Sequence, residues 1–177
     1  NRSVDVLPWG KDTRVSVVAD VGSSLSRPSA LAFAGNGELW VGLWGEQSVV
    51  AVDLGEQAVV KTVVLPGNPD TMFAGPKGSL WIVCGDAKKI CAVNTLLGRI
   101  TQSYDLGEAG ARSLFVDEDG YAWLGADTGL VCLSTSEGSS IVQRLSDGAG
   151  LAGVAIDNKG DIWAACPSKG QLVCFSG

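Results

Sequence analysis

Ser113-Leu-Phe-Val-Asp-Glu-Asp-Gly-Tyr-Ala-Trp123 is one of four copies of the same short segment in this chain. The other copies end at Trp40, Trp81 and Trp163, so successive tryptophans are 41, 42 and 40 residues apart. A glycine lies three residues before each tryptophan, at Gly37, Gly78, Gly120 and Gly160. A repeat of this period indicates an array of similar supersecondary units.

Each unit is predicted to consist of short antiparallel strands. An apolar run leads to the glycine, whose access to positive φ permits a tight hairpin turn, and a tryptophan-led strand follows. Third strands are expected at Ser48–Asp53, Lys89–Asn94, Gly129–Ser134 and Gln171–Ser176, and fourth strands at Val59–Leu65, Ile100–Leu106 and Ile141–Leu145. Asp86–Leu97 alone resembles a helix, but its β-branched counterpart Ser48–Leu54 favours strands. The pattern predicts an all-β fold, a β-propeller with about four blades of four antiparallel strands.

We expect a single propeller domain over residues 1–177, with repeat units at about 28–67, 68–109, 110–150 and 151–177. The last unit stops after its third strand. Arg14–Val21 is predicted to complete it as the outer strand beside Gln171–Ser176, which would close a four-blade ring. The alternative is that Ser3–Leu7 is a further third strand, which would make the chain a fragment of a ring of roughly six to eight blades. If the ring is incomplete, the chain is expected to be able to form an oligomer.

The pattern apolar-x-D-x-x-G-x-apolar-W-apolar-G, clearest in Leu114–Gly125, resembles the NHL, SMP-30-like and two-component-regulator propeller repeats. The resemblance covers Pro28–Gly177 and implies a WD40-like architecture, although the Gly-His and Trp-Asp dipeptides typical of WD40 repeats are missing. These superfamilies include sensors, scaffolds and enzymes, so the resemblance implies the architecture and leaves the activity open.

The composition excludes several classes of function. The 177 residues carry a net charge of −6, which argues against binding to nucleic acid. They contain no histidine, which removes Ser-His-Asp and Cys-His catalysis and every histidine-ligated metal site. No apolar run is long enough to insert into a membrane. The five cysteines form no CxxC pair and are expected to be reduced thiols of a cytoplasmic protein, with an extracellular or membrane-protein sensor domain as the alternative.

Two motifs that suggest ligands have simpler interpretations. Gly148–Gly153 matches GxGxxG, but a dinucleotide site needs this motif to open a helix, and another turn follows almost at once. Asp117–Gly120 and Asp157–Asp161 suggest calcium loops, but the twelfth residue counted from Asp117 is Thr128 instead of the required Glu. We therefore predict an interblade loop and two Asx-rich turns, with no cofactor and no metal.

Eight residues are candidates for contact with a partner. Trp9 and Trp44 belong to no repeat, and large aromatic side chains on loops often anchor partners, with local packing as the alternative. Loops between second and third strands are expected to bring a set of side chains to one face: Trp44, Glu46, Asp86, Lys88 and Asp127. The starts of the innermost strands carry Asp70 and Arg112, as a ligand contact at the channel mouth or as a solvated or mutually paired couple. The two sets are held as rival sites.

The expected function is that of a non-enzymatic binding, scaffold or sensor propeller, within a larger protein, that takes a protein or peptide partner. The alternative is a lactonase-like or lyase-like propeller enzyme with a channel metal. SMP-30-like lactonases use Glu, Asn and Asp around such a metal, whereas the aligned channel positions here supply one acid, Asp70. Virginiamycin-lyase-like propellers use a histidine, which this chain lacks. The four repeated tryptophans are expected to be buried between blades.

Overall fold

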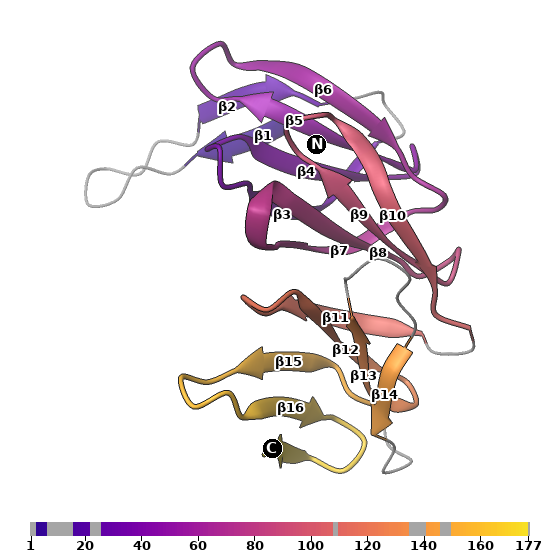
Figure 1. The fold of residues 1–177 in the computed structure, drawn as a ribbon. Helices are drawn as coiled ribbons and strands as arrows, with labels where there is room; N and C mark the ends of the chain where they lie inside the picture. The colour runs from indigo at the N-terminus through magenta and orange to yellow at the C-terminus, as the bar shows by residue number, and fades with distance from the viewer. Residues whose placement is uncertain are drawn as a thin grey trace.

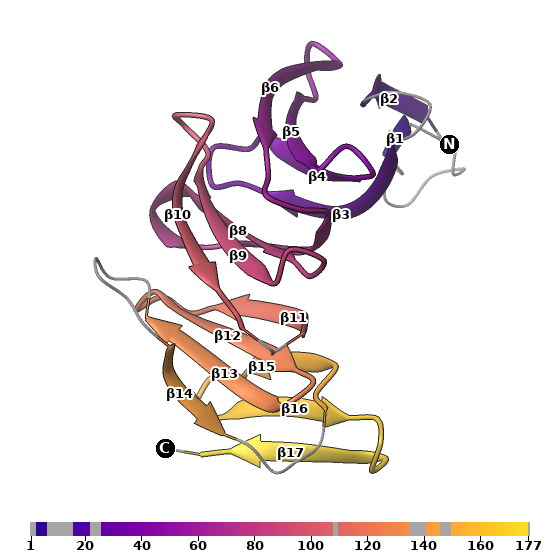
Figure 2. The same cartoon turned by 90° about the vertical axis from the view of Figure 1, so that its right-hand side faces the viewer.

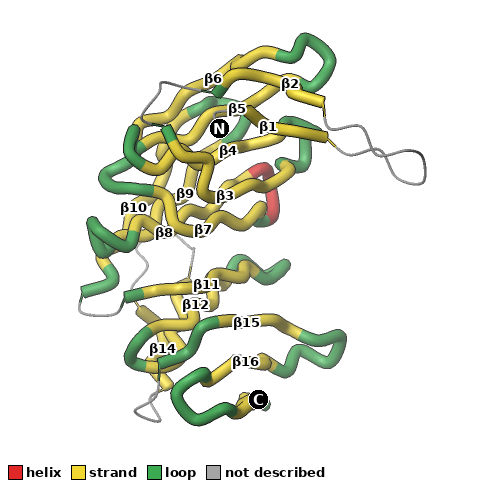
Figure 3. The backbone as a smooth tube through the Cα atoms, turned by 180° about the vertical axis from the view of Figure 1, so that it is seen from behind, coloured by secondary structure: helices red, strands yellow, loops and turns green. Residues whose placement is uncertain are grey.

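The computed structural model describes residues 3–6, 16–21, 26–107, 110–134, 141–145 and 150–176. Strands make up most of this part of the chain, and its one helical element is the 3-10 turn η1 (Pro76–Gly78), drawn in red in Figure 3. The prediction of an all-β fold is confirmed.

The strands form four blade-like antiparallel sheets and one two-stranded ladder. The ladder pairs β1 (Ser3–Val6) with β2 (Ser16–Asp20). The first blade contains β3 (Arg27–Phe33), β4 (Leu39–Trp44), β5 (Ser48–Asp53) and β6 (Ala58–Val64). The second contains β7 (Pro69–Ala74), β8 (Ser79–Cys84), β9 (Lys89–Asn94) and β10 (Arg99–Asp105). The third contains β11 (Ala111–Val116), β12 (Tyr121–Ala126), β13 (Gly129–Ser134) and β14 (Ile141–Leu145), and the C-terminal blade contains β15 (Gly153–Ile156), β16 (Ile162–Cys166) and β17 (Gln171–Phe175).

The sheets are arranged as successive propeller blades. In each of them the strands pair in chain order, and the first strands β3, β7, β11 and β15 contact one another along the inside of the array. Figure 1 shows the four sheets stacked from the first blade to the C-terminal blade. The predicted third and fourth strands match β5, β6, β9, β10, β13, β14 and β17 to within one residue at each end. The β-propeller fold is therefore confirmed, and the helical interpretation of Asp86–Leu97 is wrong.

The repeated glycines make the first turn of each blade. Gly37, Gly78, Gly120 and Gly160 all have φ between 72° and 87°, in the region that side chains disfavour. In the third blade the Gly120 N–H donates to the Asp117 carbonyl, and the C-terminal blade has the same bond from Gly160 to Asp157. The glycine three residues before each tryptophan is thus required by the turn.

Hydrophobic side chains between neighbouring blades form the core. Trp40 clusters with Leu80 and Ile82 of the second blade, and Trp81 clusters with Leu114 and Leu124 of the third. A third cluster joins the third blade to the C-terminal blade. Each of the first three blades therefore packs its tryptophan-bearing side against the blade that follows it.

The prediction that all four repeated tryptophans are buried is wrong for the last one. Trp40 is 0% exposed and Trp81 is 2% exposed, Trp123 is half-buried, and Trp163 is 42% exposed. The reason follows from the direction of packing, because no sheet follows the C-terminal blade in the described part of the chain.

The predicted ring closure is also wrong. The strand β2, expected beside Gln171–Ser176, pairs with β1 instead, and β17 pairs with β16 alone among the described strands. A hairpin partner close in sequence costs less loop entropy than a partner at the far end of the array. The β1–β2 ladder agrees with the alternative in which Ser3–Leu7 is a third strand. Figure 2 shows this ladder and β17 at opposite ends of the molecule.

Candidate functional site

Both sets of predicted contact residues lie at the same end of the blades. Strand pairing places Arg27 opposite Trp44, Pro69 opposite Cys84, and Ala111 opposite Ala126. The start of each inner strand is therefore beside the end of the second strand and the turn that follows it. We call this end the loop face: the starts of β3, β7, β11 and β15 with the β4–β5, β8–β9, β12–β13 and β16–β17 turns. The two rival sites are thus one surface; Trp9 lies outside the described residues.

Trp44 is a partly exposed aromatic side chain at the end of β4. The Arg27 guanidinium carbon lies 4.6 Å from the centroid of its ring, a cation–π contact worth about 0.5–1 kcal/mol at an exposed site. The Ser26 hydroxyl donates to the Glu46 carboxylate in the adjoining turn. Local contacts therefore hold Trp44 and Glu46 in place while leaving part of the indole accessible.

A hydrogen-bond chain links the loop face of the first blade to that of the second. The Gly45 N–H donates to Asn68 Oδ1 at 2.7 Å. The Asn68 backbone N–H and side-chain Nδ2 donate to the two oxygens of Asp86, each at 2.8 Å. Asp86 thus fixes the position of a loop between blades. Asn68 occurs in only one unit, so the repeat pattern does not point to it.

Asp70 has a similar role in the second blade. Its Oδ2 accepts the Gly85 N–H at 2.9 Å, and a Cβ built at Gly85 would lie only 2.3 Å from the same oxygen. Asp70 therefore pairs with backbone instead of Arg112, and the interpretation of a mutually paired couple is wrong. Lys88, in the next turn, adopts a left-handed conformation with φ of 52°.

Arg112 and Asp127 form an ion pair on the loop face of the third blade. Arg112 Nε donates to Asp127 Oδ1 at 2.7 Å, and both side chains are more than half exposed. The pair borders a cavity of about 200 Å³ between the third and C-terminal blades, also lined by Gly150, Leu151, Ala152, Pro167 and Ser168. The two predicted sets of contact residues thus meet at this cavity. The starts of the inner strands contribute Arg112, and the turns between second and third strands contribute Asp127.

The loop before β15 lines the same cavity and shows what the GxGxxG match forms. Within the described residues 150–153 the chain is irregular until β15 begins at Gly153, with no helix. The Leu151 N–H donates to the Ala126 carbonyl at 2.9 Å, which ties this loop to the third blade. The described part of the motif is thus an interblade loop, as predicted, while Gly148 and Ala149 lie outside the described residues.

The Asp-rich turns at the opposite end of the blades hold tryptophans. Asp117 Oδ2 accepts the Trp123 indole N–H at 2.9 Å, and Asp157 Oδ2 accepts that of Trp163 at 3.0 Å. The other oxygen of each carboxylate accepts backbone N–H groups of its own turn. The predicted Asx turns are confirmed. Over the described ranges, no group of three or more His, Cys, Asp and Glu side chains is arranged to hold a metal ion.

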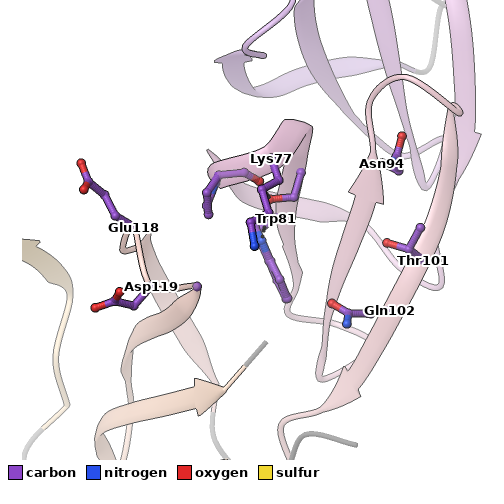
Figure 4. Close-up of a pocket in the computed structure, with 10 residues that line it drawn as sticks. Lys77, Trp81, Asn94, Thr101, Gln102, Glu118 and Asp119 are labelled. Carbon is purple, nitrogen blue, oxygen red and sulfur yellow. Dashed lines mark hydrogen bonds between the residues drawn. The ribbon is translucent and has the colours of Figure 1, made fainter. Parts of the chain in front are cut away.

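A second cavity, of about 220 Å³, opens at that end between the second and third blades. Figure 4 shows Lys77 and Trp81 in its middle, Glu118 and Asp119 on one side, and residues of β9 and β10 on the other. The full lining is Pro76, Lys77, Ser79, Trp81, Asn94, Thr101, Gln102, Glu118, Asp119 and Gly120. Two different repeat units form its walls, so the pattern within one unit does not predict this cavity.

The described residues contain no helix with the length and apolarity needed to span a membrane. No protein-family model matches the chain, and no curated protein matches its sequence.

Solved β-propellers match the chain in structure. Virginiamycin B lyase from Staphylococcus aureus aligns with a TM-score of 0.77 and 14% identity over 99% of this chain and 63% of that one. The β-propeller domain of Cps50 (Swd1) from Myceliophteria thermophila aligns with a TM-score of 0.84 and 12% identity over 99% and 64%. The WD40 β-propeller domain of Doa1 aligns with a TM-score of 0.75 and 15% identity over 99% and 61%.

This chain therefore spans about three-fifths of the length of the solved structures that it matches. At such low identity the likeness bears on the fold alone. Repeats, strand pairing and structural neighbours agree that the chain is built of β-propeller repeats.

Proposed function

We propose that this propeller is a non-enzymatic binding module whose loop face takes a protein or peptide partner. The observation that carries the proposal is the Arg112–Asp127 pair beside the cavity of about 200 Å³. Both side chains are accessible, and the cavity wall adds the apolar side chains of Leu151, Ala152 and Pro167. Apolar walls with a few convergent polar groups are the usual composition of a binding pocket.

The chemistry of the pair suits a peptide. Arg112 uses Nε for Asp127, and no hydrogen bond or ion pair occupies its terminal amino groups among the described residues. They can donate to a carbonyl or carboxylate of a partner, while Asp127 Oδ2 can accept an N–H. Trp44, on the same face, adds an aromatic contact of the kind that often contributes strongly to protein interfaces.

Lyase chemistry is a less suitable function for these residues, although virginiamycin B lyase is among the structural neighbours. A solved variant of that lyase with a histidine replaced by alanine is described as catalytically inactive. The 177 residues of this chain contain no histidine. WD40 propeller domains are also among the neighbours, which supports a binding module. We further propose a reducing compartment such as the cytoplasm, supported by the five free thiols.

The test selects ligands from a phage-displayed random peptide library and measures their affinity for the wild-type chain and its variants. Arg112→Ala should weaken binding of the selected peptides at least about tenfold, or ~1.4 kcal/mol, because charge-assisted hydrogen bonds are lost. Trp44→Ala reports on the first-blade part of the same face. Arg99→Ala is the matched control, because Arg99 is an exposed arginine at the start of β10, which is the end of the blade away from the loop face.

Peptides that bind Arg112→Ala, Asp127→Ala and Trp44→Ala as tightly as wild type would contradict the proposed site. Lactonase or lyase activity of the purified chain would contradict a non-enzymatic function.

A further inference from the structure

The cavity at the end of the blades away from the loop face is bordered by opposite charges. Lys77 in η1 of the second blade lines this cavity of about 220 Å³, and so do Glu118 and Asp119 in the β11–β12 turn of the third blade. All three side chains are exposed, and none has a hydrogen-bond or ion-pair partner among the described residues. Figure 4 shows Lys77 in the middle and both carboxylates on one side. We call this space the Lys77 cavity.

An ion pair occupies the equivalent place between the first and second blades. Lys61 and Gln102 hold the same position in β6 and β10, because each pairs with the third-strand alanine that lies opposite its blade's tryptophan. Glu38 and Ser79 likewise lie two residues before those tryptophans. Lys61 Nζ donates to Glu38 Oε1 at 2.5 Å and to the Thr95 carbonyl of the second blade at 2.9 Å. A cation and a carboxylate therefore meet directly at this first interface.

Uncharged side chains replace that ion pair at the second interface. Ser79 and Gln102 stand where the first blade has Glu38 and Lys61, and they cannot form an ion pair. The Ser79 hydroxyl is bonded within its own blade, because it donates to the Pro76 carbonyl at 2.8 Å and accepts the Trp81 indole N–H at 3.2 Å. The charges of this interface stand instead on the two turns, beside a cavity large enough for several water molecules.

The backbone of Lys77 is unusual among the residues at its turn position. Its φ of 57° lies in the left-handed region, which side chains disfavour. Asp119 and Lys159 precede the turn glycine in the third and C-terminal blades, and neither has a positive φ. Residues held in this conformation occur preferentially at functional and ligand-binding sites. The conformation of Lys77 therefore marks the cavity as a place to look for a ligand.

The wall formed by β9 and β10 adds uncharged hydrogen-bonding groups. Asn94 Oδ1 accepts the Leu97 N–H at 2.8 Å, which fixes the amide and leaves its nitrogen able to donate. Thr101 Oγ1 donates to the Ala92 carbonyl at 3.2 Å and keeps lone pairs that can accept. This wall suits an uncharged polar group that both donates and accepts hydrogen bonds.

We propose that the Lys77 cavity binds a free α-amino acid with a polar side chain. Its carboxylate accepts hydrogen bonds from Lys77, and its ammonium group donates to Glu118 or Asp119. Its side chain lies against Asn94 and Thr101. Such a ligand carries the two opposite charges that the second interface lacks as a direct pair, so it links the second and third blades. The proposal is independent of the proposed function, because this cavity lies at the other end of the blades.

The first experiment measures the thermal unfolding midpoint of the 177-residue chain with each standard amino acid in turn. A ligand that binds only the folded chain raises the midpoint, and calorimetric titration then gives its affinity. At least one amino acid with a polar side chain, such as glutamine or serine, should bind, and glucose should not. A chain that responds to no amino acid would overturn the proposal. Binding of glucose without binding of any amino acid would overturn it too, and would indicate a polyol site.

Substitutions of the charged residues test the two contacts. Lys77→Met should weaken binding of the selected amino acid at least about tenfold, and so should the double variant E118Q/D119N, because charge-assisted hydrogen bonds are lost. Lys159→Met is the matched control, because Lys159 is an exposed lysine at the same position of its turn and lies outside this cavity. It should bind like wild type. Unchanged binding by both Lys77→Met and E118Q/D119N would refute the site.

Ligand analogues separate a direct contact from a structural effect of the substitutions. The amine that lacks the carboxylate should bind wild type and Lys77→Met equally, since Lys77 has no charge to contact in it. The acid that lacks the amino group should likewise bind wild type and E118Q/D119N equally. If each substitution weakened the amino acid and both analogues by the same factor, the charges would not contact the ligand as proposed.

Filling the cavity provides a test that leaves its charges in place. Ser79→Glu combined with Gln102→Lys places the ion pair of the first interface at the second, where it should occupy the cavity. This variant should lose at least about tenfold in affinity for the selected amino acid, and its circular dichroism should match that of wild type. A folded variant that binds the amino acid as tightly as wild type would place the ligand elsewhere and overturn the proposal.

Discussion

Trp81 and Trp163 occupy the same position in two copies of one repeat, yet the first is 2% exposed and the second 42%. Their local structures are alike: each lies opposite the preceding strand, and each indole N–H donates to a side-chain oxygen near the turn. The difference is the neighbour, because the third blade covers Trp81 and no described sheet covers Trp163. In a repeat fold, local structure is set within a unit, whereas burial depends on the next unit.

The largest expected effect separates these two tryptophans. Trp81→Ala should lower the free energy of unfolding by about 3–5 kcal/mol, because a large buried side chain leaves a cavity between blades. Trp163→Ala should cost under about 1 kcal/mol, since little buried surface is lost. Trp123→Ala should fall between them. Denaturant unfolding at low protein concentration measures all three, and equal losses for Trp81 and Trp163 would refute the comparison.

A smaller effect is expected at Gly125, where the third blade meets the C-terminal blade. A Cβ built at Gly125 would lie 2.5 Å from Ser113 Oγ of its own blade, 3.0 Å from a Val154 methyl in β15 and 3.1 Å from the Leu151 carbonyl in the loop before β15. Gly125→Ala should therefore cost about 1–3 kcal/mol through overpacking. Ala165 holds the equivalent position in the C-terminal blade, whose outer side no described sheet covers.

Gly35→Ala is the control for this substitution. Gly35 has no atoms within 4 Å of a built Cβ and does not need a positive φ, so the change should be neutral or slightly stabilising. If Gly125→Ala and Gly35→Ala gave the same midpoint in thermal unfolding, the interblade gap would be wider than described.

The sequence predicts what lies within a unit better than what lies between units. The period of tryptophan and glycine gave β5, β9 and β13 with correct bounds, because alternation and turn chemistry act over a few residues. The exposure of Trp163 and the pairing of β2 depend on which sheets are neighbours, and periodicity carries no such information. Arg112 and Asp127 could be named as candidates from the sequence, because each has a defined position within its repeat unit, but their ion pair was not predicted. Asn68 and the cavity beside Glu118 were not predicted either, since they arise where different units meet.

The smallest effect concerns the turn that holds the exposed tryptophan. The Trp163 indole N–H, followed by the Lys159 backbone N–H, stabilises the Asp157 carboxylate and lowers its pKa below the ordinary value near 3.9. Because the folded pKa is the lower one, ionised Asp157 favours the folded chain above about pH 4. This contribution is lost as the pH falls through the folded value. An NMR titration should show the Trp163 indole proton shifting with a midpoint below that of an ordinary aspartate. Asp157→Asn should abolish the shift while leaving the Trp81 indole proton, which donates to Ser79 Oγ, unchanged. A midpoint at or above the ordinary value would show that this hydrogen bond does not form at the uncovered end of the array.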